Sequence, residues 1–426
     1  MRRRLGMVMV SILLTAVLGA CGKSGGSDSG GSARASSTVS GKGASSGNTV
    51  ELKLLSYFSE GETQYDILKK FVDDYHQQNP NVTIKLESAP PADLDQKILQ
   101  SATAKQVADI IILNYISVDP LHGALVPLTD YVNGDFLSQF YDANVKAGTA
   151  TDGKVYGVQI AGANDLALFY NKKLLSDAGI NPPTTWAELA SSAKVLSKDG
   201  RYGLAVSATN TVEALWQFEP FFWSNGADFS NVASPEGVEA LDFLAQLVKD
   251  GAMSKEVVNW AQGQEVDQFV AGNAAMMVNG PWNFKALNDA GIEYGVVTIP
   301  VPKAGMKPVV AVGGEVFSLG NTGDEGRTKE AAKFLEYLAD SDRYIDLVHG
   351  FGYLPSLKAK SDEFKGQFPE YTPFLDQMAY AKPMYDEKGY LKLDKIMQVA
   401  IQSALTGQAT PKDALDKAAK EIANIQ

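Results

Sequence analysis

The residues best suited to chemistry lie in one short stretch, which reads LWQFEPFFWSNGADF from Leu215 to Phe229. One acid, Glu219, lies among six aromatic side chains, which are Trp216, Phe218, Phe221, Phe222, Trp223 and Phe229. A carboxylate accepts hydrogen bonds and an aromatic ring offers a broad apolar face, so the stretch could form a platform for a ligand. Aromatic side chains also bury themselves in ordinary cores, and the composition alone leaves both interpretations open.

The chain lacks the common motifs of cofactor binding and catalysis. It has no G-x-x-x-x-G-K-[ST] loop, no G-x-G-x-x-G opening a helix and no G-x-S-x-G elbow between a strand and a helix. His76, His122 and His349 are far apart and lack metal-ligand spacing, so we expect no metal site and no cofactor. A carboxylate pair for glycoside hydrolysis follows no spacing rule, so a secreted glycoside hydrolase remains an alternative.

Length and charge narrow the class of protein further. The 426 residues are 45% hydrophobic, which is enough for one large domain or two medium ones. The net charge of −12 argues against nucleic acid, whose binding relies on clustered Lys and Arg. It also argues against a surface that lies on anionic lipid.

The N-terminus carries the pattern of an exported lipoprotein. Three arginines, residues 2–4, precede the short apolar run Leu5–Leu18. The next residues, Gly19-Ala20-Cys21, complete a segment that resembles the lipobox of bacterial lipoproteins, where the peptide is cut before an acylated cysteine. We expect a signal peptide over residues 1–20 and a lipid on Cys21. Because Cys21 is the only cysteine, no internal disulfide is available.

Residues 21–48 predict a tether behind this lipid. They are rich in Gly and Ser and nearly free of large apolar side chains. No later segment is long and apolar enough to span a bilayer. The membrane is therefore reached only through the lipid anchor.

The body of the chain reads as alternating strands and helices. Strands are predicted over residues 50–55, 82–86 and 110–113, with helices near 67–75 and 94–102 between them. This order predicts an α/β fold with a largely parallel sheet, and the length favours two lobes. Capping signals at Thr185, Ser234 and Thr410 predict three further helices.

Several segments in a fixed order carry a family resemblance. They are ADIII (108–112), GALVPLTD (123–130), GKVYG (153–157), ALFYNK (167–172), PPTTW (182–186), FVAGNAAMMVNGPW (269–282), AAKFLEYL (331–338) and GYLP (352–355). Their order and spacing resemble the carbohydrate-binding group of extracellular solute-binding proteins of bacterial ABC importers. AAMMVNGPW and EPFF are most similar to segments of the maltose/maltodextrin-binding proteins.

The resemblance implies two α/β lobes joined by hinge strands, with the ligand in the cleft between them. The chain would cross near residues 159–163, 309–314 and 354–359. The first lobe would comprise residues 49–160 and 313–358, and the second lobe residues 164–309 and 360–426.

The resemblance also implies site residues. Trp282 matches a sugar-stacking tryptophan, and Glu219, Phe221 and Phe222 match an acid and an aromatic pair of the cleft. Trp186, Trp216, Phe218 and Trp223 would pack behind them. Either Asn164 or Asp165 would supply a polar group after the first crossing.

Further candidates lie on the first lobe and the returning strand. Ligand contacts are expected from Tyr57, Phe58 and Glu60, and from Gly314 and Glu315. Tyr115 would replace an absent tryptophan, and the segment Leu393–Gly407 lacks a second tryptophan of the maltodextrin binders.

These expectations describe a non-enzymatic subunit of an importer. It would be a monomer anchored on the outer face of the cytoplasmic membrane or in the periplasm. It would pass a mono- or oligosaccharide to ABC permease subunits, and the ATPase would be another polypeptide. An alternative keeps the fold but binds a polyamine, using Glu219 and Asp165, or a phosphorylated solute, which would require clustered Arg.

Overall fold

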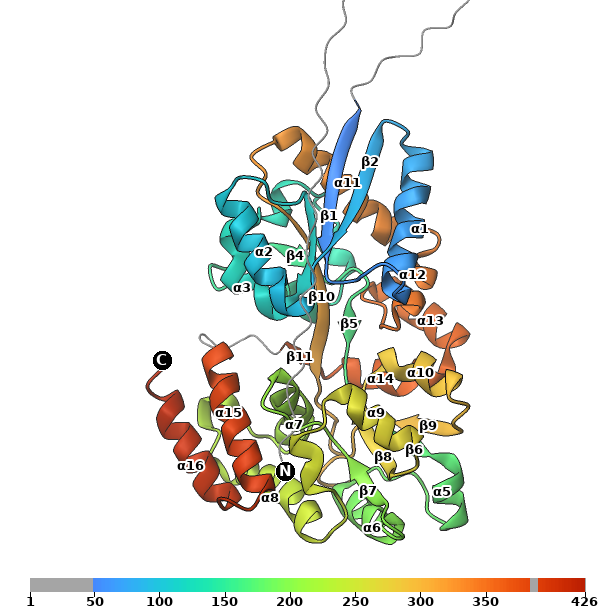
Figure 1. The fold of residues 1–426 in the computed structure, drawn as a ribbon, viewed down its shortest axis with the longest axis vertical. Helices are drawn as coiled ribbons and strands as arrows, with labels where there is room; N and C mark the ends of the chain where they lie inside the picture. The colour runs from blue at the N-terminus through green and yellow to red at the C-terminus, as the bar shows by residue number, and fades with distance from the viewer. Residues whose placement is uncertain (1–48, 384–389, 426) are drawn as a thin grey trace, which may run out of the picture. The chain divides into compact units, whose positions relative to one another are not determined.

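The computed structural model describes residues 49–383 and 390–425 (Figure 1). The expected signal peptide, the lipid site at Cys21 and nearly all of the tether lie outside the described residues. Within the described part of the chain, no helix has the length and apolarity needed to cross a bilayer.

The first sheet collects strands from widely separated parts of the described chain. Its order is β11-β10-β3-β1-β2, and β4 and β5 also pair with β10. The strands are β1 (Val50–Ser56), β2 (Val82–Ser88), β3 (Ile110–Asn114), β4 (Gly157–Val158), β5 (Ala163–Asn164), β10 (Ala311–Leu319) and β11 (Lys382–Pro383). β1 runs parallel to β2 and β3, whereas β10 runs antiparallel to β3. The sheet is therefore mixed rather than largely parallel, because β10 returns from the second sheet in the opposite direction.

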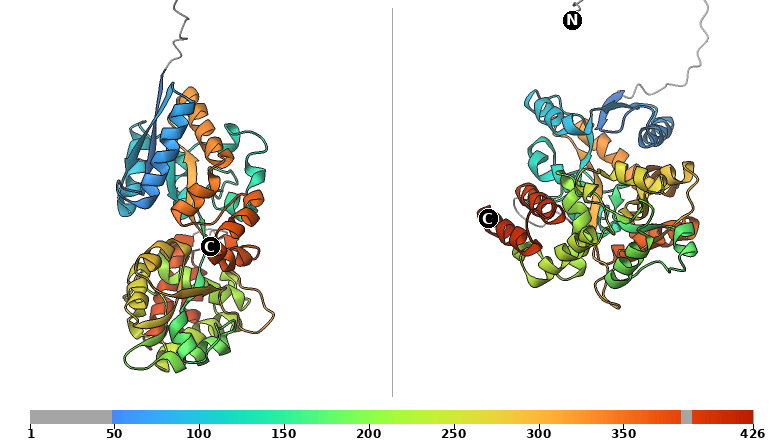
Figure 2. Two further views of the ribbon diagram at one scale, coloured as in Figure 1. Left: turned by 90° about the vertical axis from the view of Figure 1, so that its right-hand side faces the viewer. Right: turned by 60° about the horizontal axis from the view of Figure 1, so that its bottom comes forward.

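The second sheet is built from the middle of the chain, in the order β7-β8-β6-β9. Its strands are β6 (Ala167–Asn171), β7 (Tyr202–Ala205), β8 (Ala274–Asn279) and β9 (Tyr294–Val297). Figures 1 and 2 show the two sheets as separate layers with helices beside each. The predicted α/β architecture is confirmed, but both sheets are mixed rather than largely parallel.

The helices follow the strands in chain order. They are α1 (Thr63–Gln78), α2 (Pro91–Thr103), α3 (Val118–Leu121), α4 (Asp142–Lys146), α5 (Lys172–Asp177), α6 (Trp186–Leu196), α7 (Val212–Ser224), α8 (Pro235–Lys249), α9 (Gln262–Val270), α10 (Phe284–Asp289), α11 (Glu325–Asp340), α12 (Tyr344–Phe351), α13 (Ser361–Gln367), α14 (Thr372–Met378), α15 (Tyr390–Leu405) and α16 (Pro411–Ile422). The last two helices pack beside α8, and α15 also packs on α7 (Figure 2).

The three capping signals begin helices where the sequence predicts them. The hydroxyl of Thr185 accepts a hydrogen bond from the backbone N–H of Glu188, whose carboxylate accepts one in return. Ser234 caps α8 and Thr410 caps α16, each through its side-chain oxygen. These local hydrogen bonds satisfy N–H groups that a helix start leaves free.

Strand β3 lies at the centre of the first sheet and is buried on both faces. Ile110 and Ile112 belong to one hydrophobic cluster, while Ile111 and Leu113 belong to the other. Successive side chains of a strand point to opposite faces, so a continuous apolar run fills both. The sequence Ile-Ile-Ile-Leu therefore places the end of β3 deep inside the molecule.

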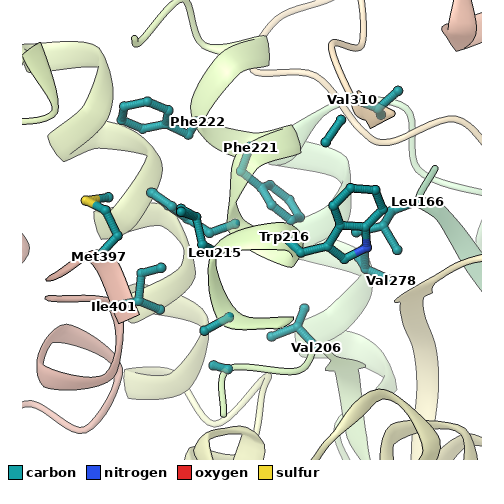
Figure 3. Close-up of a cluster of buried hydrophobic side chains, with 14 of the residues drawn as sticks. Leu166, Val206, Leu215, Trp216, Phe221, Phe222, Val278, Val310, Met397 and Ile401 are labelled. Carbon is teal, nitrogen blue, oxygen red and sulfur yellow. The ribbon is translucent and has the colours of Figure 1, made fainter. Parts of the chain in front are cut away.

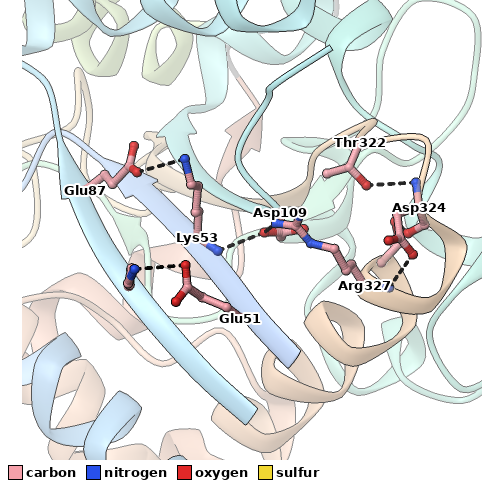
Figure 4. A network of polar contacts seen from close by, with 9 residues as sticks. Glu51, Lys53, Glu87, Asp109, Thr322, Asp324 and Arg327 are labelled. Carbon is pink, nitrogen blue, oxygen red and sulfur yellow. Dashed lines mark hydrogen bonds and ion pairs between the residues drawn. The ribbon is translucent and has the colours of Figure 1, made fainter. Parts of the chain in front are cut away.

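An ion pair between Asp109, which directly precedes β3, and the partly exposed Arg327 anchors β3 to α11 (Figure 4). Asp109 is fully buried, and its carboxylate accepts hydrogen bonds from the guanidinium of Arg327 and from the backbone N–H of Lys53 at 2.8 Å. Removing one partner of such a pair leaves a buried charge uncompensated. This network holds β1 and α11 to the start of β3, whose opposite end is Asn114.

Three segments meet between the two sheets. Gly313 and Gly314 of β10 pair with Asn164 and Ala163 of β5, and Ala163 also forms a bridge with Leu354. From Glu315 onward, β10 pairs with β3, and its residues Phe317 and Ser318 also pair with β4. Gly314 has a φ of +114°, and a Cβ there would collide with the carbonyl oxygen of Gly162. Only glycine fits this close approach without strain.

Candidate ligand-binding site

A pocket of about 270 Å³ lies where these segments meet, near the lower end of the range for small-molecule sites. Its lining residues come from elements of the first sheet, such as β3 and β10, and from elements beside the second sheet, such as α7 and α9. The residues are Asn114, Tyr115, Ile116, Asn164, Val212, Glu213, Trp216, Gln262, Trp282, Gly313, Gly314, Glu315, Tyr353 and Tyr390.

Aromatic rings make up a large share of the walls. Tyr115 follows β3, Trp216 lies in the first turns of α7, and Trp282 lies in the turn after β8. Tyr353 follows α12, and Tyr390 begins α15. The side chain of Trp282 is only partly buried, and it lines the pocket. Such rings contribute apolar area, and the tyrosines add hydroxyl groups for hydrogen bonds.

Glu315 lies in the part of the pocket formed by the crossing strand. It is 4% exposed, and the hydroxyl of Tyr57 donates a hydrogen bond to its Oε1. Burial raises the pKa of Glu315 to about 7, although the hydroxyl groups of Tyr57 and Tyr353 oppose that shift. The pocket therefore contains a carboxyl group that can change protonation near neutral pH.

This shift makes the stability of the protein depend on pH in a defined window. Because the folded-state pKa lies above the ordinary value of 4.5, the folded state binds more protons than the unfolded state between pH 4.5 and about 7. We expect the free energy of unfolding to fall as pH rises through this window, by up to about 3 kcal/mol relative to an E315Q variant. Urea unfolding of both proteins at several pH values measures the difference, and parallel curves would contradict the prediction.

The structure separates the two neighbouring candidates after the first crossing. Asn164 faces the pocket, whereas the fully buried Asp165 accepts a hydrogen bond from Gln377 Nε2 at 3.2 Å. Burial raises the pKa of Asp165 well above its ordinary value. Consecutive residues of an extended chain point in opposite directions, so only one of the two can face the ligand.

The acid and aromatic pair of α7 lie in the core rather than in the pocket. Phe221 and Phe222 are fully buried, and Figure 3 shows Phe222 on the side of α7 that faces Met397. Trp216 lies on the other side, toward Leu166 (Figure 3). Each helical residue turns by roughly 100°, so residues five and six positions after Trp216 point away from its direction.

The position of Trp216 differs from the sequence prediction. The sequence predicts it to pack behind the site, but its indole lines the pocket and lies against Gly313. A Cβ at Gly313 would collide with the Trp216 ring, so glycine permits this contact. The companions predicted to be core, Trp186, Phe218 and Trp223, are buried.

Glu219 does not line the pocket itself but contacts a residue that does. It is fully buried, and its Oε1 accepts a hydrogen bond at 3.0 Å from the hydroxyl of Tyr390, which lines the pocket. Burial raises the pKa of Glu219 well above its ordinary value, and the neighbouring Asp394 adds to that shift. The acid of the EPFF segment therefore holds a pocket tyrosine instead of facing the cleft.

The three candidates after β1 differ in their surroundings. Tyr57 donates the hydrogen bond to Glu315 described above. Phe58 is buried and its ring meets Phe351 edge-on, with the ring centroids 5.4 Å apart. Glu60 is exposed in the following loop and does not belong to the pocket lining.

Several pocket residues carry a weak sequence signal or none. Trp216 lies three residues after Glu213 and four after Val212, which places it on the same face as both at the start of α7. That spacing could have found them once the Thr211 cap had fixed where α7 begins. Gln262, Tyr353 and Tyr390 are far apart in sequence, and only the fold brings them together.

The ionisable carboxyl groups and amines of the described pocket lining are not balanced, because only acidic side chains are present among them. Its described lining residues include two acids, Glu213 and Glu315, and no lysine or arginine. The Glu213 carboxylate accepts hydrogen bonds from Ser207 Oγ at 2.8 Å and from the backbone N–H of Gln262 at 2.9 Å. Among the described residues, no cluster of three or more His, Cys, Asp or Glu side chains could hold a metal ion.

Two mixed sheets, crossing strands and an aromatic pocket between them define a solute-binding protein. The family model of the bacterial extracellular solute-binding proteins matches residues 70–372, and the chain belongs to that family.

Its relatives include binding proteins of sugar importers. A binding protein of Brucella abortus (strain 2308) is 27% identical over 395 residues, which cover 88% of this chain and 93% of the relative. The maltooligosaccharide ABC transporter solute-binding lipoprotein of Streptococcus pneumoniae (strain ATCC BAA-255 / R6) is 27% identical over 354 residues, 78% of each chain. The sn-glycerol-3-phosphate-binding periplasmic protein of Rhizobium meliloti (strain 1021) is 24% identical over 403 residues, 87% of this chain and 89% of the relative.

A solved structure supports the same classification. The cyclic alpha-maltosyl-1,6-maltose binding protein of Arthrobacter globiformis superposes with a TM-score of 0.78 at 26% identity. The match covers 89% of this chain and 99% of that structure. The two-lobed fold implied by the sequence resemblance is that of these binding proteins.

Proposed function

We propose that this protein binds an uncharged oligosaccharide in the pocket and delivers it to the membrane permease of an ABC importer. The observation that carries the proposal is the lining of five aromatic side chains with polar groups and no lysine or arginine. Indole and phenol rings cover the apolar C–H faces of sugar rings, while carboxylate and amide groups bond to the hydroxyls. Relatives named for maltooligosaccharide support this substrate class.

The same proposal includes closure and anchoring. The ligand favours a closed arrangement of the two lobes, and Gly313, Gly314 and the strands beside them form the hinge. A lipid on Cys21 and the tether over residues 21–48 hold the binding body near the permease, outside the cytoplasm, as a monomer. The Streptococcus relative, whose name describes a lipoprotein, supports the anchor.

Calorimetry of the full chain tests the ligand class. We expect maltotriose or maltose to bind and to raise the melting temperature, because a ligand that binds only the folded state stabilises it. If a panel of neutral saccharides produces neither heat nor stabilisation, the sugar assignment is wrong. Chromatography of the incubated sugar provides a second check, since any hydrolysis product would contradict a pure binding role.

The pocket chemistry also ranks the other solutes. A phosphorylated solute would need cationic partners, which the described lining residues do not include. A polyamine would meet Glu213 and Glu315 rather than Glu219 and Asp165, which are buried away from the pocket. Spermidine and sn-glycerol-3-phosphate are therefore the comparison ligands in the same calorimetric series.

A further inference from the structure

Three pocket residues come from three separate elements that lie beside the second sheet or follow one of its strands. Trp216 belongs to α7, Gln262 is the first residue of α9, and Trp282 lies in the turn that follows β8. Their side chains must keep fixed relative positions for the pocket to keep its shape, and no direct hydrogen bond between these three side chains is found among the described contacts.

One buried carboxylate connects all three elements. Glu265 lies on α9, one turn after Gln262, and is fully buried. Its Oε2 accepts a hydrogen bond from Gln217 Nε2 at 2.8 Å and another from Asn279 Nδ2 at 3.2 Å. Gln217 directly follows Trp216, and Asn279 ends β8 just before the turn that carries Trp282.

The hydrogen bonds continue into the Trp282 turn. Asn279 Oδ1 accepts from the backbone N–H of Gly280 at 2.9 Å and from Asn283 Nδ2 at 2.6 Å. Asn279 Nδ2 also donates to the backbone carbonyl of Gln262 at 3.2 Å. The turn over residues 280–283 is thereby tied at both ends to the side chain that Glu265 holds.

The network is buried, which makes it sensitive to the loss of its central acceptor. Gln217, Asn279 and Glu265 are each at most 1% exposed. A buried amide donor that loses its partner costs more than the bond contributes when it is formed. Burial raises the pKa of Glu265 well above its ordinary value, so a neutral glutamine of the same shape is a conservative replacement.

We propose that Glu265 is a positioning residue that fixes Trp216, Gln262 and Trp282 in their ligand-binding arrangement. The assignment of these three side chains to the ligand rests on the proposed function. The arrangement itself does not, so it can be measured without any sugar.

Fluorine NMR of the full chain labelled with 5-fluorotryptophan provides this sugar-free measurement. The chain has five tryptophans, and single Trp→Phe variants assign the resonances. We expect E265A to shift or broaden the signals of Trp216 and Trp282 and to leave that of Trp186 in place. E265Q should restore the wild-type spectrum.

The binding measurement uses maltotriose as the probe. E265A should weaken binding about tenfold or more, since two amide donors lose their acceptor, and E265Q should retain most of the affinity. D109A is the matched control: it removes another fully buried carboxylate, but one bonded to Lys53 of β1 and Arg327 of α11. It should lower the melting temperature without changing the affinity of the folded protein.

The outcomes separate the two proposals. If E265A behaves like D109A, with a lower melting temperature but unchanged indole signals and affinity, the positioning role is wrong. If the indole signals move while the wild-type protein binds no saccharide, the positioning role stands and the proposed function fails.

Discussion

Replacing Trp282 by alanine is expected to weaken maltotriose binding by roughly 30-fold, which corresponds to about 2 kcal/mol of binding free energy. The partly open indole lies on the turn after β8 and lines the pocket. A flat ring that stacks on a sugar loses its whole contact area when it is truncated, and alanine offers no substitute. Isothermal titration calorimetry of the full chain measures the change directly.

Two controls distinguish a lost ligand contact from a damaged fold. W282F keeps a flat apolar ring and should recover part of the affinity. W186F changes a buried indole that stacks on Phe243, with ring centroids 4.6 Å apart and 14° between planes. It should reduce stability and leave binding unchanged. If W282A binds maltotriose as tightly as the wild-type protein, Trp282 is not a ligand contact.

The local elements of this fold were predictable because their signals lie within a few residues. The Thr185 capping box, the Ser234 cap and the continuous apolar run of β3 each determine structure through neighbouring hydrogen bonds or side-chain alternation. The sheet that these elements form was less predictable. β10 pairs antiparallel to β3 although roughly 200 residues separate them, and no local pattern encodes that pairing.

The candidate site shows the same division between local and distant information. The aromatic stretch was found, but which of its side chains face the pocket depends on how α7 is rotated. Trp216 lines the pocket while Phe221 lies in the core, and both are bulky, apolar and on one helix. A buried hydrogen bond joins α7 to α9 through Gln217 and Glu265, and no local pattern in α7 reveals that distant partner.

Glu315 and Tyr390 show how the fold creates site chemistry that composition cannot. Glu315 owes its raised pKa to burial on β10, and the hydroxyl of Tyr57, which directly follows β1, donates a hydrogen bond that opposes the shift. Tyr390 is held by Glu219 from another helix. In both cases an acid and a phenol more than 150 residues apart along the sequence become partners in the folded protein.

Replacing Gly314 by alanine is expected to cause the largest loss of stability among single methyl additions to this protein. Gly314 combines a φ of +114° with a carbonyl oxygen of Gly162 in the space that a Cβ would occupy. Backbone strain alone costs about 1–3 kcal/mol, and the collision forces two paired strands apart, so we expect a total loss of about 3 kcal/mol or more.

Two other glycines separate the contributions of strain and collision. Gly407 has a φ of +73° but no heavy atom within 4 Å of the added Cβ, so G407A should show strain alone, about 1 kcal/mol. Gly123 has neither feature, and G123A should be close to neutral. Urea unfolding of the three variants gives the ranking, and equal losses at Gly314 and Gly407 would show that the crossing strands can yield.

Gly314 also lies in the pocket lining, so G314A is expected to affect ligand binding as well as stability. β10 pairs with β5 at Gly313 and Gly314, and its pairing with β3 begins at the next residue, Glu315, which lines the pocket. A strand that must bend there and present Glu315 to a ligand needs a residue without a side chain at the bend. We therefore expect G314A to weaken maltotriose binding in its folded fraction, whereas G407A should bind like the wild-type protein. Calorimetry at a temperature where both variants are folded measures this difference, and unchanged affinity in G314A would show that the bend serves the fold and not the site.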